Sequence, residues 1–279
     1  MRWLWLSSLV LLLLVPACAH LAFNRSSNSD SSLHELSRGQ LVFHSDFRLP
    51  QRHRLIEELE SQRQVLASLL KLPVSDEPIH VFLFENAVHY REFTSAKFPR
   101  LPERRAFFVQ SDTQLAVFAF WGNRIAEDLR HEVTHGYVHA VVPEIPLWLD
   151  EGIAEYMEVP RGQQGFHRRH TQLLFEHWRK HHWRPDLRRL EQLATLDQMS
   201  IMDYAESWLW VHFLLQTQQY RAGLLQDYLA RLRMTGLAPP MSHELHLADP
   251  VHEDSIMSHL ALLVERHHLP LASEFFEPK

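Results

Sequence analysis

The sequence contains a single cysteine, Cys18, in 279 residues. One cysteine cannot form an intramolecular disulfide, which excludes the class of small secreted proteins that depend on such bonds. The folded part must therefore be stabilised by a hydrophobic core, and about 240 ordered residues are enough to bury one.

The sequence also lacks a sustained basic patch. Its formal net charge is −6, and arginine pairs such as Arg168-Arg169 are short. Proteins that bind nucleic acid usually carry a basic surface, so no nucleic-acid partner is expected. No internal repeat and no apolar run long enough to cross a bilayer are evident.

The N-terminus has the pattern of an export signal. Residues 4–15 are almost wholly apolar but too short to span a bilayer, and Arg2 precedes them. Residues 1–19 are therefore predicted to be a signal peptide, and residues 20–38, which are rich in Ser and Asn, a flexible tether.

The end of the signal resembles a bacterial lipobox. The segment Val15-Pro16-Ala17-Cys18 would make Cys18 the lipidated first residue of the mature chain, anchored to a membrane of the cell envelope. The alternative is ordinary signal cleavage at Ala17-Cys18-Ala19, which would release a soluble periplasmic or secreted protein.

The strongest chemical motif is the segment His131-Glu132-Val133-Thr134-His135. On a helix, residues four apart project from the same face, so His131 and His135 can present two imidazole nitrogens to one Zn²⁺. Glu132 would sit beside the open coordination position. Asn123 is a plausible N-cap, and residues 125–142 contain no proline, which predicts one helix.

A second helix is predicted from about Pro146. It contains Trp148-Leu149-Asp150-Glu151-Gly152 and places Glu151 sixteen residues after His135. Because a short turn bounded by prolines joins the two helices, they should fold back on each other and bring Glu151 towards the imidazoles.

These residues resemble the gluzincin metallopeptidases, and most closely the small peptidase MA-like domains. The resemblance covers roughly residues 40–220 and implies an α+β zincin-like fold with a Zn²⁺ ion. It assigns His131, His135 and Glu151 as the metal ligands and Glu132 as the general base. No Gly-x-Met-x-Asn motif precedes the helix, so aminopeptidase activity is not implied.

Other metal motifs do not fit. A metzincin would need Gly and His where Val138 and Val141 stand, and the inverted His-x-x-Glu-His order is absent. His139 is expected to be a packing residue or to support a ligand. For Glu155, a solvated position and a role in orienting a ligand histidine both remain open.

Tyr204 is the other candidate for catalysis. Tyr204-Ala205-Glu206-Ser207 begins an apolar helix and resembles the Tyr-x-Lys-Gly helix start of aminopeptidase-like gluzincins, whose tyrosine stabilises an oxyanion. A neutral phenol can donate a hydrogen bond there without competing for the metal. A packing tyrosine is the alternative, and His212 would be the substitute donor.

The remaining pattern predicts one domain over residues 39–270. Its N-terminal α/β lobe, about residues 39–142, should contain a mixed sheet with helices, and its C-terminal lobe, about residues 143–270, should be mostly helical. Segments 106–109 and 114–120 are expected to form a hairpin across Ser111-Asp112-Thr113. The second of these strands would either offer an open edge to an extended peptide or lie inside the sheet.

The sequence thus favours an exported zinc metallopeptidase that acts on a peptide or protein substrate. Two alternatives belong to other classes: a catalytically inactive zincin fold used for binding or assembly in the envelope, and a metal-binding lipoprotein that uses the 21 histidines. Glu132 favours the enzyme, because storage of zinc needs no base beside the metal.

Overall fold

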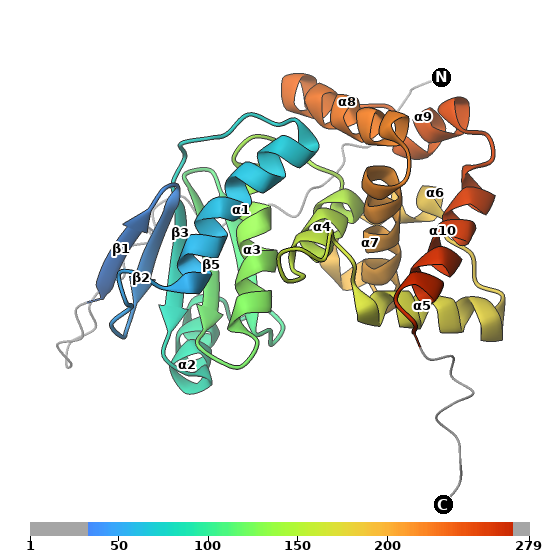
Figure 1. The fold of residues 1–279 in the computed structure, drawn as a ribbon. Coiled ribbons are helices and arrows are strands. Elements are labelled where there is room, and N and C mark those ends of the chain that lie inside the picture. Colours follow the sequence, from blue (N-terminus) through green and yellow to red (C-terminus); the bar gives the residue numbers. More distant parts are fainter. Residues whose placement is uncertain (1–32, 270–279) are drawn as a thin grey trace, which may run out of the picture.

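The computed structural model describes residues 33–269 and contains a five-stranded sheet followed by a helical half (Figure 1). The strands are β1 (His34–Arg38), β2 (Leu41–Ser45), β3 (Ile79–Phe84), β4 (Ala106–Ser111) and β5 (Gln114–Phe120). The first four helices are α1 (Arg54–Leu70), α2 (Ala87–Lys97), α3 (Ile125–His139) and α4 (Leu147–Met157). The later helices are α5 (Arg168–His181), α6 (Leu187–Leu190), the short 3₁₀ helix η1 (Leu196–Gln198), α7 (Ile201–Gln216), α8 (Gln219–Thr235), α9 (Met241–Ala248) and α10 (His252–Arg266).

The sheet is mixed, with strand order β1-β2-β3-β5-β4. The central strands β2, β3 and β5 are parallel, whereas β1 and β4 pair antiparallel at the two edges. The predicted α+β class with a mixed N-terminal sheet is therefore confirmed, and the helical C-terminal half follows it in the chain.

The predicted hairpin is present, but its open edge belongs to the other strand. β4 and β5 pair around Asp112 and Thr113, with Ser111 opposite Gln114. β5 then pairs with β3 on its second side, so of the two predicted alternatives the interior position is confirmed and the open edge is excluded. In this hairpin the backbone groups available for pairing lie on β4, which is one edge of the described sheet, and β1 is the other edge.

The predicted tether is wrong at its C-terminal end. Residues 34–38 form β1, whose residues pair in register with β2 from His34 opposite Ser45 to Arg38 opposite Leu41. Gly39, with a φ of 54°, makes the turn between the two strands. The predicted signal peptide and Cys18 lie outside the described residues.

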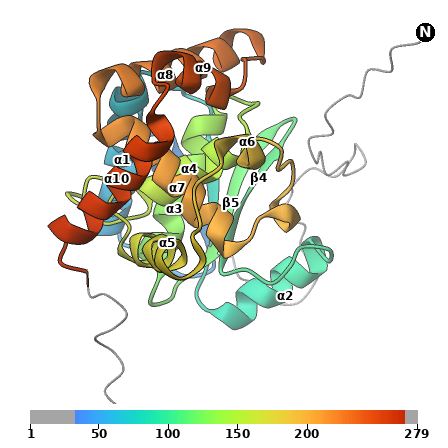
Figure 2. The same ribbon diagram turned by 90° about the vertical axis from the view of Figure 1, so that its right-hand side faces the viewer.

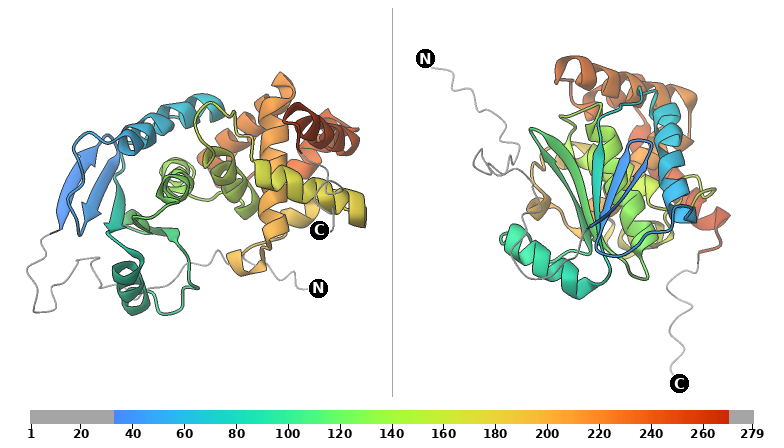
Figure 3. Two further views of the ribbon diagram at one scale, coloured as in Figure 1. Left: turned by 60° about the horizontal axis from the view of Figure 1, so that its bottom comes forward. Right: turned by 90° about the vertical axis from the view of Figure 1, so that its left-hand side faces the viewer.

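Helices cover both faces of the sheet. α2 packs on one face over an aromatic cluster that includes Phe82, Phe107 and Phe118. α1 and α3 pack on the other face and lie between the sheet and the C-terminal helices (Figures 1 and 3). A single large core continues from this face into the helical half, so α3 is held from both sides.

The helical half is built around α7, which α4 and α5 contact (Figure 2). α4 lies very close to α7 because Gly152 has no side chain. A Cβ at this position would come within 2.6 Å of the Ser207 carbonyl oxygen and 2.8 Å of Val211. Gly152, which follows Glu151, therefore determines how closely α4 packs against α7. This packing in turn sets the position of Glu151.

The helix ends differ slightly from the sequence prediction. α3 ends at His139 rather than Val142, and its N-cap is Arg124 without a side-chain cap bond, so the assignment of Asn123 as N-cap is wrong. α4 begins directly after Pro146, as predicted. Within residues 33–269, none of the helices is both long and apolar enough to cross a membrane.

Candidate metal centre

α3 brings the residues of the predicted metal motif to one side of a helix whose other side is buried. Leu129, Val133 and Val138 pack into the core. The rings of His131 and His135, one turn apart, have centroids 5.0 Å from each other. The apolar face of the helix therefore directs both imidazoles away from the core and towards α4.

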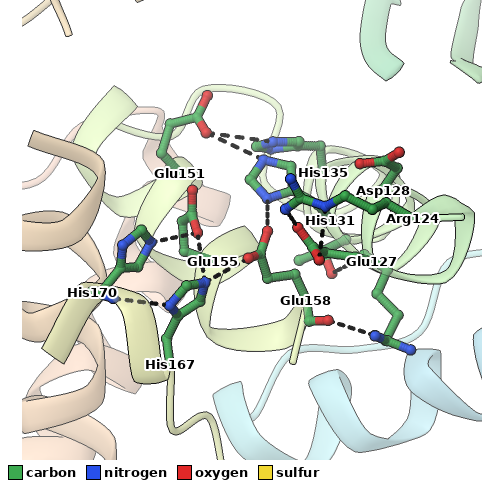
Figure 4. A network of polar contacts seen from close by, with 12 residues as sticks. Arg124, Glu127, Asp128, His131, His135, Glu151, Glu155, Glu158, His167 and His170 are labelled. Atoms are coloured by element: carbon green, nitrogen blue, oxygen red, sulfur yellow. Dashed lines mark hydrogen bonds and ion pairs between the residues drawn. The ribbon is translucent and has the colours of Figure 1, made fainter. Parts of the chain in front are cut away.

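α4 folds back along α3 and brings Glu151 to both imidazoles (Figure 4). Its Oε2 atom lies 3.4 Å from Nε2 of His131 and 3.8 Å from Nε2 of His135. A tetrahedral zinc ion with bonds of about 2.0–2.1 Å separates its ligand atoms by roughly 3.3 Å. The three side chains can therefore hold a metal ion, and the chemistry and spacing of the donors fit zinc.

A carboxylate also lies behind each imidazole. Nδ1 of His135 forms an ion pair with Oδ1 of Asp150 at 3.0 Å. The second carboxylate oxygen of Asp150 is 3.0 Å from Nε2 of His139. His139 thus supports His135 through Asp150, in line with the expected supporting role.

The carboxylate next to Nδ1 of His131 belongs to Glu158, which no motif in the sequence indicates. Its Oε2 accepts a hydrogen bond from Nδ1 of His131 at 3.1 Å. Glu155 is buried, which excludes the solvated alternative, but it bonds to His170 at 2.7 Å and to no predicted ligand. Asp128 pairs with Arg105 instead of joining this network.

These carboxylates make the centre attractive to positive charge. Burial alone would lower the pKa of His131, but hydrogen bonds to Glu151 and Glu158 raise it well above 6.5. Burial likewise opposes protonation of His135, and the charge of Asp150 outweighs it and raises the pKa to about 9. A divalent cation between the two rings would be stabilised by the same negative charges.

Glu132 lies in the same electrostatic environment, next to both imidazoles on α3. Burial raises its pKa above 4.5, the positive charges of His131 and His135 lower it, and the charge of Glu151 raises it again. The net shift is upward. A carboxylate with a raised pKa is better suited to accept and return a proton near neutral pH.

Tyr204 lies in the first turn of α7 and is half-buried. Its pKa is affected by residues of the same centre. Burial and the charge of Glu151 raise its pKa to about 12, against the opposing effect of a hydrogen bond and charge from Arg104. Its hydroxyl is therefore protonated at neutral pH and able to donate. Arg104 also acts on the pKa of Glu132. Because Arg104 lies in the loop before β4, nothing in the local sequence pattern indicated its position.

The open-edged strand β4 forms the neighbouring wall. Phe108 of β4 stacks on His135 with ring centroids 5.9 Å apart and an interplanar angle of 23°. Two residues further on, Gln110 bonds through Oε1 to Nδ1 of His139 at 2.6 Å. The free backbone edge of β4 therefore runs beside α3, the helix that carries His131 and His135.

His212 does not face this centre. It is buried in α7, and its Nδ1 lies 2.9 Å from Nε2 of His259 on α10. The expectation that His212 substitutes for Tyr204 as a donor is therefore wrong, and the histidine pair is part of the helical core.

The buried histidine pair predicts loss of stability in acid. Burial lowers the pKa of His212 to about 3 and that of His259 to about 4, from 6.5 in each case. The unfolded chain therefore binds more protons below pH 6.5, and the contribution of the pair is lost as the pH falls from 6.5 towards 4. At pH 5 this amounts to about 2 kcal/mol per ring, or about 4 kcal/mol in total.

Urea unfolding of the wild type at pH 7.5 and pH 5 measures this loss. The double variant His212→Leu, His259→Leu should show a clearly smaller decrease in the free energy of unfolding over the same interval. An equal decrease in both proteins would contradict the assignment.

Comparison with known proteins gives no further indication. No protein-family model matches the sequence, and no curated protein is significantly similar to it.

Proposed function

We propose that this protein is a zinc-dependent peptidase of the gluzincin type, with a zincin-like fold. The observation that carries the proposal is the approach of Glu151 to Nε2 of both His131 and His135, with Glu132 adjacent. Two histidines and one carboxylate leave a fourth zinc position open, which is typical of catalytic zinc sites and not of structural ones.

When bound, zinc would polarise the scissile carbonyl and lower the pKa of a water molecule to about 7. Glu132 would accept the proton of the attacking water and pass it to the leaving amine, a role for which its raised pKa is suited. The hydroxyl of Tyr204 donates a hydrogen bond to the oxygen of the substrate carbonyl as negative charge develops there.

The substrate in this proposal is an extended peptide bound along β4. The free edge of this strand can pair with a peptide backbone, and Phe108 places it next to His135. Backbone pairing holds a peptide largely independently of its sequence, while neighbouring side chains select among residues. Arg104, whose charge reaches both Glu132 and Tyr204, is such a neighbour.

Metal analysis tests the metal centre directly. The purified protein should carry close to one zinc per chain, and His131→Ala, His135→Ala and Glu151→Ala should each lower occupancy sharply, because three ligands have no redundancy. Glu176→Ala, an exposed carboxylate of α5, is the matched control and should retain the metal. Full zinc retention in Glu151→Ala would remove Glu151 from the ligand set.

The proposed location is the bacterial cell envelope, with the domain attached to a membrane through a lipid on Cys18. This proposal depends on the lipobox-like sequence and not on the fold. Ordinary signal cleavage, giving a soluble exported protein, stays as its alternative.

A further inference from the structure

A second group of histidines and carboxylates lies directly behind His131, where α4 ends and α5 begins (Figure 4). Glu158 accepts from Nδ1 of His131 through Oε2, and its other oxygen, Oε1, lies 2.8 Å from Nε2 of His167. His170 stacks on His167 with ring centroids 3.7 Å apart and bonds to Glu155 at 2.7 Å. All four of these side chains are largely buried.

The N-terminus of α5 fixes the proton on His167. This residue is the N-cap of α5, and its Nδ1 accepts a hydrogen bond from the backbone N–H of His170 at 3.1 Å. A neutral imidazole has one acceptor nitrogen and one N–H, so the proton must be on Nε2. Nε2 is the atom that faces Glu158, and it therefore acts as a donor.

The same reasoning continues to His131. A carboxylate can only accept, so Glu158 receives one N–H from His167 and one from Nδ1 of His131. With its proton held on Nδ1, the neutral His131 ring has its lone pair on Nε2, which faces Glu151 and the metal position. A histidine that binds a metal usually donates its other N–H in this way, and the partner orients the ring.

The loop between α4 and α5 is built to hold His167 in this position. Trp208 of α7 is fully buried and donates from its indole nitrogen to the Gly165 carbonyl oxygen at 2.8 Å. Gly165 has a φ of 76°, and a Cβ there would come within 2.0 Å of the Tyr156 ring. Only glycine fits this turn, and the turn delivers His167 to Glu158.

We infer that His167 is a positioning residue that acts through Glu158 to set the tautomer and orientation of the metal ligand His131. The inference rests on the proposed metal centre. The residues that orient the metal ligands then include one at the start of α5, outside both the His-Glu-x-x-His motif and the second helix of the site.

Two substitutions separate this role from helix capping. Asn in His167→Asn can still cap α5 through its side-chain oxygen, but its amide nitrogen is one bond too short to replace Nε2. Gln in His167→Gln carries a donor at the distance of Nε2 but is a poor cap. Zinc affinity should therefore fall about 10–100-fold in His167→Asn with little change in thermal stability, and should be closer to wild type in His167→Gln. His181→Ala, an exposed residue of the same helix, is the matched control.

Zinc affinity is measured on the full chain by competition with a chelator, together with metal stoichiometry, and the tautomer of His167 by NMR of ¹⁵N-labelled histidine in the metal-free protein. Wild-type affinity in His167→Asn, or a proton on Nδ1 of His167, overturns the inference. So does a second zinc that disappears in His167→Asn, since the cluster would then be a metal site itself. Absence of zinc binding in the wild type would instead refute the proposed function. The measurement therefore distinguishes failure of the proposed function from failure of the inference about His167.

Discussion

Glu132→Gln is expected to keep its zinc and its fold and to lose peptide hydrolysis, by at least about 10²–10⁴-fold. The amide has nearly the shape of the carboxylate but cannot accept the proton of the attacking water. Glu132 is not one of the three residues that converge on the metal position, so the metal should remain. The variant thus separates chemistry from metal binding.

The measurement is cleavage of a peptide library by wild type and variant, with zinc content determined on the same samples. Glu127→Gln is the matched control, because Glu127 lies on the same helix but pairs with Arg124 instead of facing the metal position. Cleavage by Glu132→Gln at the wild-type rate would refute the mechanism. A zinc-loaded wild type that cleaves no peptide would favour the inactive binding module.

Tyr204→Phe is expected to lower kcat by about 10²–10³, equivalent to roughly 2.7–4 kcal/mol, with little change in KM or zinc content. The hydroxyl forms its bond only when the carbonyl oxygen becomes negatively charged, so its loss affects the transition state and not substrate binding. The pKa of about 12 keeps the proton on the hydroxyl throughout the range in which Glu132 works.

Steady-state kinetics on the best library peptide provide the test. Tyr220→Phe changes an exposed tyrosine of α8 and should behave as wild type. A decrease in kcat of less than about threefold would return Tyr204 to a packing role. Because His212 faces α10, the next donor to replace would then be Arg104.

Local spacing was sufficient to predict the elements that carry the proposed chemistry. His131 and His135 share a face because they are four residues apart on a helix, and this follows wherever the helix packs. The approach of Glu151 was also predictable, since a short turn bounded by prolines leaves two helices little freedom other than to pack antiparallel. The α+β class was implied by the family resemblance and agrees with the order of strand and helix patterns along the chain.

The errors and the alternatives that stayed open concern relations between segments that are distant in sequence. The hairpin of β4 and β5 was predicted from its turn, but which strand is left at the edge depends on where β3 inserts, and no local pattern encodes that. Residues 34–38 have no strong strand pattern and become a strand because β2 offers them a partner. Tyr204 and His212 are eight residues apart on α7, which amounts to a rotation of about 80° beyond two full turns. This rotation is enough for Tyr204 to lie under the influence of the charge of Glu151 while His212 faces α10.

The partners of the metal ligands were decided by tertiary structure for the same reason. Glu155 lies in the last turn of α4 and Glu158 is the C-cap of that helix, and the sequence offers no reason to prefer the second carboxylate. The choice depends on the turn at Gly165, which brings His170 to Glu155 and His167 to Glu158. One oxygen of Glu158 then bonds to His167 and the other to His131. A side chain's chemistry is a local property, whereas the group it faces is determined by the packing of all the elements around it.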